Sequence, residues 1–334
     1  MGDFFDRLCE AAGGAGQVKK DELMKRHTTF RVGGPARYFV SPEGEAALSR
    51  VLAVCRGEGI PYYILGNGSN LLVSDQGYDG VMILIGEGFS WIEKAAGDEA
   101  AGEEKSSFVN AKTQDGAEQT VAVGTVRYTV GAGLLLSRIA KEALEDSLTG
   151  FEFAAGIPGT LGGAVVMNAG AYGGEMKDVL KKARLMDKNG TILELDVSEL
   201  DLSYRHSCIL EKEYIVLSAE IELKKGEKAE IQEMMDDLAF RRRDKQPLEY
   251  PSAGSTFKRP EGYFAGKLIQ DAGLRGYREG GAQVSEKHCG FVINREQATA
   301  EDIRGLCGTV QKKVKEAFGV DLECEIRMLG WEQT

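Results

Sequence analysis

The stretch GIPGTLGGAVVMNAGAYGGE, residues 156–175, determines how the rest of the sequence is interpreted. Its first nineteen residues carry no charge and are rich in glycine and alanine. A glycine inside a helix or strand costs about 0.5–1 kcal/mol relative to alanine, so such a run needs a compensating gain. Tight packing of backbone on backbone is one explanation. Close approach of the main chain to a large ligand is the other, and we favour it.

This glycine-rich run does not match the common mononucleotide motifs. The dinucleotide fingerprint G-x-G-x-x-G follows a strand and opens a helix, whereas this run has the spacing GxxGxxGG interrupted by Pro158. The segment GYFAGKL at 262–268 is one residue too short for a Walker A loop and lacks its final Ser or Thr. Both motifs are therefore excluded.

A second glycine-rich loop, Gly66-Asn67-Gly68-Ser69-Asn70, follows an apolar run. Successive N–H groups of such a loop can form an anion-binding nest, and the alternative is a plain turn between two strands. Two glycine-rich loops without a mononucleotide motif suggest a large, flat ligand held by main-chain groups.

Composition excludes several classes of protein. The 334 residues are 43% hydrophobic, which predicts two or three domains with sizeable cores. A net charge of −11 and a pI near 5.1 argue against nucleic acid as a partner. The six scattered cysteines are expected to be reduced thiols in a cytoplasm. We expect no signal peptide, no membrane span, and no metal site, because His27, His206 and His288 are dispersed.

The order of the expected elements gives the domain plan. A β-α-β unit opens the chain, with a helix over 43–59 and a strand–loop–strand segment over 61–85. Asn189-Gly190 between apolar strands predicts a hairpin over 183–196. Helices are expected over 230–247 and over 300–318, the latter with Thr299 and Asp302 as a capping box. We place one domain over 1–225 and a second over 226–334.

The polar, acidic segment 93–119 interrupts the first domain. It has few large apolar side chains, so we expect a surface insertion without a catalytic role. Such an insertion could be mobile.

Three side chains are candidates for chemistry, each with an ordinary structural alternative. Arg205 lies between two strands and could clamp a carboxylate or phosphate, although such an arginine is more often in a surface ion pair. Ser255 follows a glycine and could be an exposed proton donor or a simple turn residue. Glu325 lies in an expected strand over 323–327. If its carboxyl group is buried beside an anion, it could be protonated and donate a hydrogen bond. The ordinary alternative is that Glu325 lies on the solvent-exposed edge of a sheet.

Seven segments of this sequence, taken in order, resemble the UDP-N-acetylenolpyruvoylglucosamine reductase family over residues 20–330. They are TTFRVGGPA, LGNGSNLLVSD, GIPGTLGGAVVMNAGAYGGE, YRHS, AGSTFKRP, KLIQDAGLRGYREGGAQVSEKHCGFVIN and LECEIRMLG. Any one of them is a weak signal, but seven in order are specific. The spacing of about thirty residues between Leu223 and Ser255 resembles the shorter subtype, which lacks a substrate-covering tyrosine segment.

The resemblance implies an α+β fold: an FAD-binding domain of the vanillyl-alcohol-oxidase type with two subdomains, followed by a substrate-binding domain. It implies a cytoplasmic oxidoreductase that binds FAD non-covalently and uses NADPH. The implied reaction reduces UDP-N-acetylglucosamine enolpyruvate to UDP-N-acetylmuramate for peptidoglycan synthesis. We expect a monomer with no nucleic-acid or membrane partner.

The resemblance also assigns roles to residues. Arg205 and Glu325 match residues that polarise the substrate carboxylate, and Ser255 matches the serine that protonates the carbon beside it. The residues expected to bind the cofactor are Gly66, Asn67, Gly68, Ser69, Asn70, Gly156, Ile157, Pro158, Gly159, Gly162, Gly163, Ala169 and Gly170. Those expected to bind the substrate are Tyr204, Lys245, Tyr250, Lys258 and Gln283, with Lys245, Tyr250 and Lys258 as candidates for the UDP diphosphate.

Two other functions remain open at this stage. The chain could be an oxidase of the same fold, which would share the glycine loops but would not be expected to combine Arg205, Ser255 and Glu325. It could also be a non-catalytic nucleotide-sugar binding protein, which would have no need of a flavin.

Overall fold

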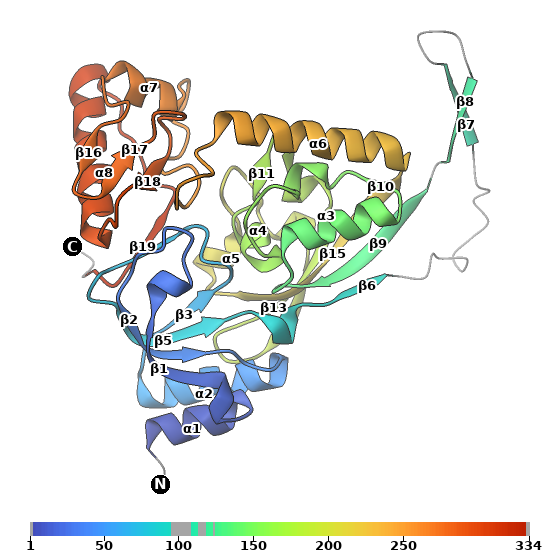
Figure 1. The fold of residues 1–334 in the computed structure, drawn as a ribbon. Helices are drawn as coiled ribbons and strands as arrows, with labels where there is room; N and C mark the ends of the chain where they lie inside the picture. The colour runs from blue at the N-terminus through green and yellow to red at the C-terminus, as the bar shows by residue number, and fades with distance from the viewer. Residues whose placement is uncertain (1–2, 95–107, 113–117, 123, 332–334) are drawn as a thin grey trace. The chain divides into compact units, whose positions relative to one another are not determined.

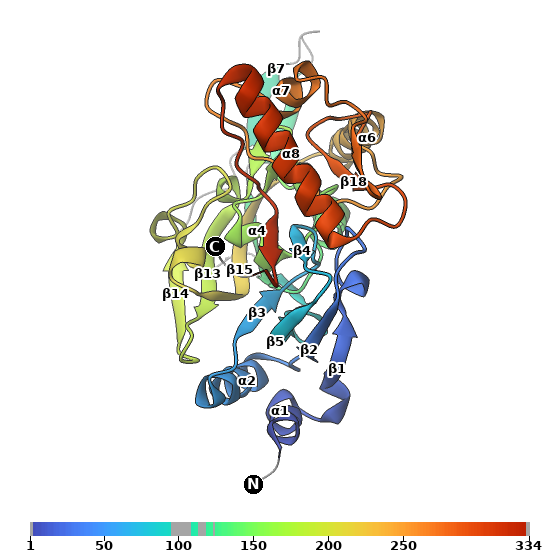
Figure 2. The ribbon, with the colours of Figure 1, turned by 90° about the vertical axis from the view of Figure 1, so that its left-hand side faces the viewer.

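The computed structural model describes residues 3–94, 108–112, 118–122 and 124–331 (Figures 1 and 2). The chain forms two compact units, each assembled from separate stretches. Unit 1 comprises residues 1–42, 53–84 and 242–334, and unit 2 comprises residues 43–52 and 85–241. The division into domains over 1–225 and 226–334 stays a prediction.

The elements of unit 1 are α1 (Phe4–Ala12), β1 (Val18–Leu23), β2 (Pro35–Val40), β3 (Tyr62–Leu65), β4 (Leu71–Val73), β5 (Tyr78–Leu84), α7 (Ala265–Asp271), β16 (Arg278–Glu279), β17 (Ala282–Val284), β18 (Val292–Asn294), α8 (Ala300–Phe318) and β19 (Arg327–Leu329). Those of unit 2 are β6 (Ile92–Lys94), β7 (Phe108–Lys112), β8 (Glu118–Ala122), β9 (Thr125–Gly131), α3 (Leu136–Glu145), β10 (Leu148–Thr149), α4 (Leu161–Val166), β11 (Gly170–Ala171), β12 (Gly174–Glu175), β13 (Leu180–Met186), β14 (Ile192–Asp196), α5 (Cys208–Glu211) and β15 (Ile215–Lys225). Helices α2 (Glu45–Glu58) and α6 (Lys228–Lys245) each have residues in both units.

Unit 1 contains a four-stranded sheet in the order β1-β2-β5-β3. Strands β1 and β2 are antiparallel, whereas β2 and β3 both lie parallel to β5. The buried apolar cluster of this part includes Met24, Phe39, Leu65 and Met82. The predicted strand–loop–strand segment over 61–85 is therefore confirmed, with the glycine-rich loop between β3 and β4.

The last third of unit 1 places α8 against the antiparallel sheet β16-β17-β18 (Figure 2). The Thr299–Asp302 capping box is present at the start of α8, as predicted. The cluster beneath α8 also includes Phe30 and Leu72 from the first third of the chain. Strand β19 then pairs in parallel with β4, so that Arg327 lies opposite Leu71. The end and the beginning of the sequence thus build one folded body.

Unit 2 is built on a sheet in the order β14-β13-β15-β9-β6. Helix α4 packs on β15 and β9. Strands β13 and β14 form the predicted hairpin around Gly190, which has φ +87° (Figure 2). That φ lies in the left-handed region that favours glycine, which is why Asn-Gly specifies this turn.

The predicted insertion over 93–119 is described only in part. Strands β7 and β8 pair antiparallel, whereas residues 95–107 and 113–117 lie outside the described residues. The expected surface loop therefore contains a β-hairpin.

The predicted strand over 323–327 is displaced. Cys324 forms a single bridge with Phe257, and the regular strand β19 begins at Arg327. Glu325 lies between the bridge and the strand, where two different segments hold its backbone. Side-chain alternation alone did not reveal this change of pairing partner.

Candidate active-site elements

Ser255 and Glu325 lie on neighbouring segments of unit 1. Ser255 is exposed and follows Gly254, whose φ of +76° requires glycine. The next residue, Thr256, is fully buried, and its carbonyl accepts a hydrogen bond of 2.8 Å from the Glu325 N–H. The structure therefore brings two of the three predicted catalytic residues together.

Thr256 is an anchor that sequence reasoning missed. Its N–H donates to the Gly290 carbonyl at 2.8 Å, and its hydroxyl oxygen accepts from the Val292 N–H at 2.9 Å. Burial of a polar side chain is favourable only when it is hydrogen-bonded, as this one is. Nothing in the local sequence distinguishes Thr256 from a turn threonine, because both partners are more than thirty residues away along the chain.

The glycine-rich loop over residues 66–70 lies beside the same segments. The Asn70 amide nitrogen donates to the Glu325 carbonyl at 3.2 Å, and the Asn70 carbonyl accepts from the Arg327 N–H at 3.0 Å. Gly68 has φ +61°, and a Cβ atom there would lie 1.9 Å from the His27 carbonyl oxygen. Gly68 therefore permits close backbone packing, which is the structural explanation for this glycine.

The predicted substrate-binding residues of unit 1 occupy different places. Lys258 forms an ion pair with Glu323 at 2.5 Å, on the segment that carries Glu325. Lys245 is the last residue of α6. Gln283 is 3% exposed in β17 and donates to the Gly276 carbonyl at 3.1 Å, so its side chain is committed to the fold.

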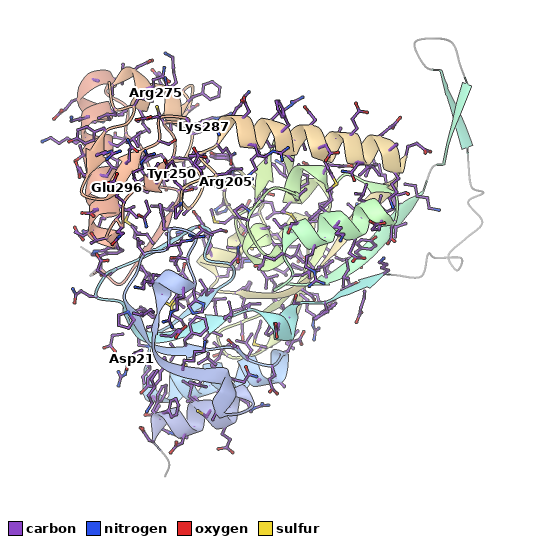
Figure 3. All side chains as sticks on the ribbon, in the orientation of Figure 1. Asp21, Arg205, Tyr250, Arg275, Lys287 and Glu296 are labelled. Carbon is purple, nitrogen blue, oxygen red and sulfur yellow. The ribbon has the colours of Figure 1, made fainter. Side chains whose placement is uncertain are left out.

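Tyr250 lines a separate open cavity of about 680 Å³ within unit 1. The Arg295 guanidinium hydrogen-bonds the hydroxyl of Tyr250 and lies 4.4 Å from the centroid of its ring. Tyr250 is labelled in Figure 3. Lys25 and Arg31 also line this cavity, whereas Ser255 and Glu325 do not. Tyr250 thus lines a cavity that the two predicted catalytic residues of this unit do not line.

The glycine-rich run over 156–175 lies in unit 2, and several of its glycines are explained by packing. A Cβ atom on Gly162 would lie 3.0 Å from the Cβ of Ala132, and one on Gly170 would lie 2.6 Å from the Gly174 carbonyl oxygen. A Cβ atom on Gly174 would lie 2.7 Å from the ring of Phe153. Close packing therefore accounts for part of the run: of backbone on backbone at Gly170, the explanation that we did not favour, and of backbone on side chains at Gly162 and Gly174.

Gly163 does not fit that explanation. It is exposed, and a Cβ atom there would have its nearest neighbour 3.8 Å away, at the Thr160 hydroxyl. Among the described residues its N–H has no hydrogen-bond acceptor, whereas those of Leu161 and Gly162 bond to the carbonyls of Leu134 and Ala132. An exposed main-chain donor without a side chain is the feature that a flavin or a pyrophosphate would need, so this segment fits the cofactor.

Arg205 occupies the tip of a tight turn in unit 2. Ser203 and His206 exchange two backbone hydrogen bonds of 3.2 Å, which leaves Tyr204 and Arg205 between them. Arg205 has φ +55°, a conformation that costs a non-glycine residue roughly 1–2 kcal/mol. Its guanidinium donates to the Gly170 carbonyl at 3.3 Å and lies 5.1 Å from the centroid of the Tyr204 ring. The turn thus holds Arg205 against the end of the glycine-rich run.

Asn168 is a second anchor that sequence reasoning missed. It is fully buried, and its amide nitrogen donates to Glu175 at 2.7 Å and to the Ser203 carbonyl at 3.0 Å. Its amide oxygen accepts from the Lys177 N–H at 2.9 Å. The sequence did offer a signal for this role, because Asn168 is a single asparagine in an apolar run. A buried amide needs several hydrogen-bond partners, so such a residue indicates an anchor.

The carboxyl group of Glu175 lies in this same network. The main reason that the pKa of Glu175 is lowered is its hydrogen bond with Lys177. Partial burial raises the pKa and so opposes this shift. Asn168 and the nearby Arg205 lower the pKa further. Glu175 is therefore a fixed negative charge beside the Arg205 turn.

A thiol pair adjoins Glu325. A hydrogen bond between Cys307 and Cys324 lowers the pKa of Cys324 and raises that of Cys307, and burial raises both. The other five cysteines are buried, whereas Cys324 is partly exposed.

No group of three His, Cys, Asp or Glu side chains in the described part of the chain could hold a metal ion. None of the helices described is long and apolar enough to cross a membrane.

Comparison with known proteins identifies both parts of the chain. Residues 112–196 match the family of FAD binding domains, and residues 246–329 match the C-terminal domain of UDP-N-acetylenolpyruvoylglucosamine reductase. The predicted α+β fold with these two domains is confirmed.

Whole-chain relatives agree with the domain matches. The UDP-N-acetylenolpyruvoylglucosamine reductase of Agathobacter rectalis is 51% identical over 93% of each chain, and that of Caldanaerobacter subterraneus is 50% identical over 94% of each. The crystal structure of the Thermus caldophilus reductase is 33% identical, with a TM-score of 0.71 over 94% of this chain and 99% of that one. The chain therefore belongs to the UDP-N-acetylenolpyruvoylglucosamine reductase family of FAD-dependent oxidoreductases.

Proposed function

We propose that the protein reduces UDP-N-acetylglucosamine enolpyruvate to UDP-N-acetylmuramate, with NADPH as the electron donor and FAD as the cofactor. The observation that carries the proposal is the 2.8 Å hydrogen bond that ties Glu325 to the residue after Ser255. It supports a common site for the acid and the proton donor, in a chain that is about half identical to named reductases along nearly its whole length.

FAD, when bound, supplies a carrier that takes a hydride from NADPH and gives it to the terminal vinyl carbon of the substrate. The residues proposed to hold it are the loop over 66–70 and the run over 156–170, through main-chain groups. Gly163 supports this assignment because of its exposed N–H.

The protein's own groups complete the reaction with charge and a proton. Hydride addition at the vinyl carbon builds negative charge on the neighbouring carbon and on its carboxylate. Arg205, and Glu325 in its protonated form, would donate hydrogen bonds to that carboxylate. Such electrostatic stabilisation of developing charge is usually the largest single contribution to lowering the activation free energy. Ser255 would donate its proton to the carbon, so that one hydride and one proton saturate the double bond.

The remaining substrate contacts are proposals about the nucleotide sugar. Tyr204 lies beside Arg205 and is 48% exposed, so a ligand could reach its ring. Lys245 and Lys258 supply positive charge in unit 1 for the diphosphate. Tyr250 and Gln283 are weaker candidates, because Tyr250 lines a different cavity and the amide of Gln283 is committed to Gly276.

We further propose that the protein acts as a monomer in the cytoplasm, where NADPH and nucleotide sugars are made. Sedimentation of the flavin-loaded protein tests the first part.

The absorption spectrum of the purified protein tests the function directly. Anaerobic NADPH should bleach the yellow flavin band, and the enolpyruvyl substrate should restore it. In Ser255→Ala the bleaching should persist and the recovery should collapse. A flavin that only oxygen restores would overturn the proposed substrate, and two intact half-reactions in Ser255→Ala would overturn the role of the serine.

A further inference from the structure

We propose that Asn70 is a positioning residue for Glu325, and that its side chain serves the glutamate rather than the flavin. This inference rests on the proposed function, because it concerns the reaction in which Glu325 takes part. It departs from the resemblance, which placed Asn70 among the cofactor-binding residues of the glycine-rich loop.

The first step of the argument is the direction of the Asn70 side chain. Its amide nitrogen donates a hydrogen bond of 3.2 Å to the carbonyl of Glu325. Its main-chain carbonyl accepts from Arg327 at 3.0 Å. Asn70 therefore contacts the chain on both sides of Ile326, at the residue before the β4–β19 pairing begins.

The second step is what these contacts do to Glu325. On its N–H side, Glu325 is bonded to the carbonyl of Thr256, the residue after Ser255. On its carbonyl side it is bonded to Asn70. Both main-chain polar groups are thus fixed by different segments, and the Cα–Cβ bond of Glu325 has its direction set between them.

The third step is the place of Glu325 in the chain. Glu325 stands outside regular secondary structure, after the isolated Cys324 bridge and before β19. A residue without a continuous ladder depends on individual hydrogen bonds for its orientation. Misplacement of a catalytic group by about 1 Å can cost on the order of 10²-fold in rate.

The experiment separates flavin binding from the reaction with substrate. In Asn70→Ala, flavin reoxidation by the enolpyruvyl substrate should slow by about tenfold or more. Flavin reduction by NADPH and the dissociation constant for FAD should each stay within about twofold of wild type. Asn70→Asp keeps the shape of the side chain and loses its N–H donor. It should likewise slow reoxidation by substrate and leave NADPH reduction and FAD affinity unchanged, and it replaces the alanine variant if that variant folds poorly.

Gln311→Ala is the matched control. The Gln311 amide nitrogen donates at 2.8 Å to the carbonyl of Leu322, on the same segment but three residues before Glu325. We expect both this variant and Asn70→Ala to have a lower melting temperature than wild type. Only Gln311→Ala should leave reoxidation within about twofold of wild type.

A double variant tests whether Asn70 acts through Glu325. Adding Asn70→Ala to Glu325→Ala should slow reoxidation no further than Glu325→Ala alone, because there is no longer a hydrogen-bonding side chain to position. Multiplicative effects would overturn the inference. So would a loss of FAD affinity with both half-reactions slowed in parallel, or a reoxidation rate that matches Gln311→Ala.

Failure of the proposed function would look different. It would show as a wild-type flavin that the enolpyruvyl substrate does not reoxidise. The FAD dissociation constant of Asn70→Ala still decides in that case whether the side chain serves the flavin.

Discussion

The guanidinium of Arg205 donates a hydrogen bond to the main-chain carbonyl of Gly170, at 3.3 Å, from a turn residue with φ +55°. A type of turn that requires positive φ at this position normally carries glycine or asparagine. Retaining an arginine there costs folding free energy, and residues held in such conformations cluster at functional sites. The strained backbone at Arg205 supports its proposed role.

Substitutions at Arg205 should separate stability from activity. Arg205→Gly should be more stable than Arg205→Ala by about 0.5–1 kcal/mol, because glycine relieves the strain and loses part of that gain to the entropy of the unfolded chain. Both variants should slow flavin reoxidation by substrate by about 10²–10³-fold. Urea unfolding and rapid-mixing kinetics measure the two effects. Tyr204, the neighbouring turn residue, has an ordinary φ, so glycine there should be less stable than alanine; the same order at both positions would contradict the strain argument.

Gly163→Ala should stabilise the protein and weaken its cofactor binding. Gly163 lies within α4, and a Cβ atom there would make only an ordinary van der Waals contact, at 3.8 Å from the Thr160 hydroxyl. Alanine should therefore raise the free energy of unfolding of the flavin-free protein by up to about 1 kcal/mol. The added methyl group should raise the dissociation constant for FAD. Gly308→Ala in α8, with open space around it, is the control and should stabilise without affecting FAD. Equal FAD binding in both variants would favour packing as the reason for the whole glycine run.

Asp302 should make the stability of α8 depend on pH. Hydrogen bonds from the main-chain N–H groups of Thr299, the larger cause, and of Gly281 lower its pKa, against an opposing effect of burial. A carboxyl with a lowered folded-state pKa stabilises the fold above its unfolded pKa of about 3.9, and this contribution is lost as pH falls through the folded-state value.

Asp302→Asn should therefore lower the free energy of unfolding by about 1 kcal/mol at pH 7. The difference from wild type should shrink below about pH 4, where the wild-type carboxyl gains a proton. Urea titrations at both pH values measure it. Asp321→Asn removes an exposed ion pair with Lys315 near the other end of α8 and should have a small effect. A constant difference for Asp302→Asn across pH would contradict the capping argument.

Cys324 should be the first cysteine to react with iodoacetamide. Its pKa is lowered by the hydrogen bond with Cys307, and the thiolate is the reactive form. The adduct would adjoin Glu325, so flavin reoxidation by substrate should fall in step with modification, as peptide mapping can follow. Cys324→Ser should retain activity through the same treatment. Earlier labelling of any buried cysteine, or inactivation of Cys324→Ser at the wild-type rate, would refute this assignment.

Features encoded by neighbouring residues could be predicted from the sequence. Asn189-Gly190 indicated its hairpin and Thr299 with Asp302 indicated the start of α8, because these residues satisfy their own local backbone groups. The glycine-rich loop at residues 66–70 and the exposed position of Ser255 could also be predicted, because neighbouring residues indicate them. Features that depend on distant partners could not be predicted. The alternation of Glu323, Glu325 and Arg327 suggested one strand, but the segment changes partner from Phe257 to β4 within a few residues.

The anchors of the candidate site fall in this second group. The role of Thr256 depends on Gly290 and Glu325, and that of Asn168 depends on Ser203. No periodicity or local motif encodes these distances. Resemblance to a family supplied the identities of Arg205, Ser255 and Glu325, and the structure adds which main-chain groups orient them.

The pairing of β4 with β19 also has a consequence for how the protein is made. Asn70 and Glu325 are separated by 255 positions. A ribosome that adds about 5–20 residues per second takes roughly 13–50 s to cover that distance. During this interval the nascent β4 has no partner strand, and its apolar residues Leu71, Leu72 and Val73 are available to chaperones. The segment that carries β19 is thus the one that closes this edge. A chain that stops before Glu325 would lack the glutamate proposed to be catalytic and would leave β4 without its partner strand.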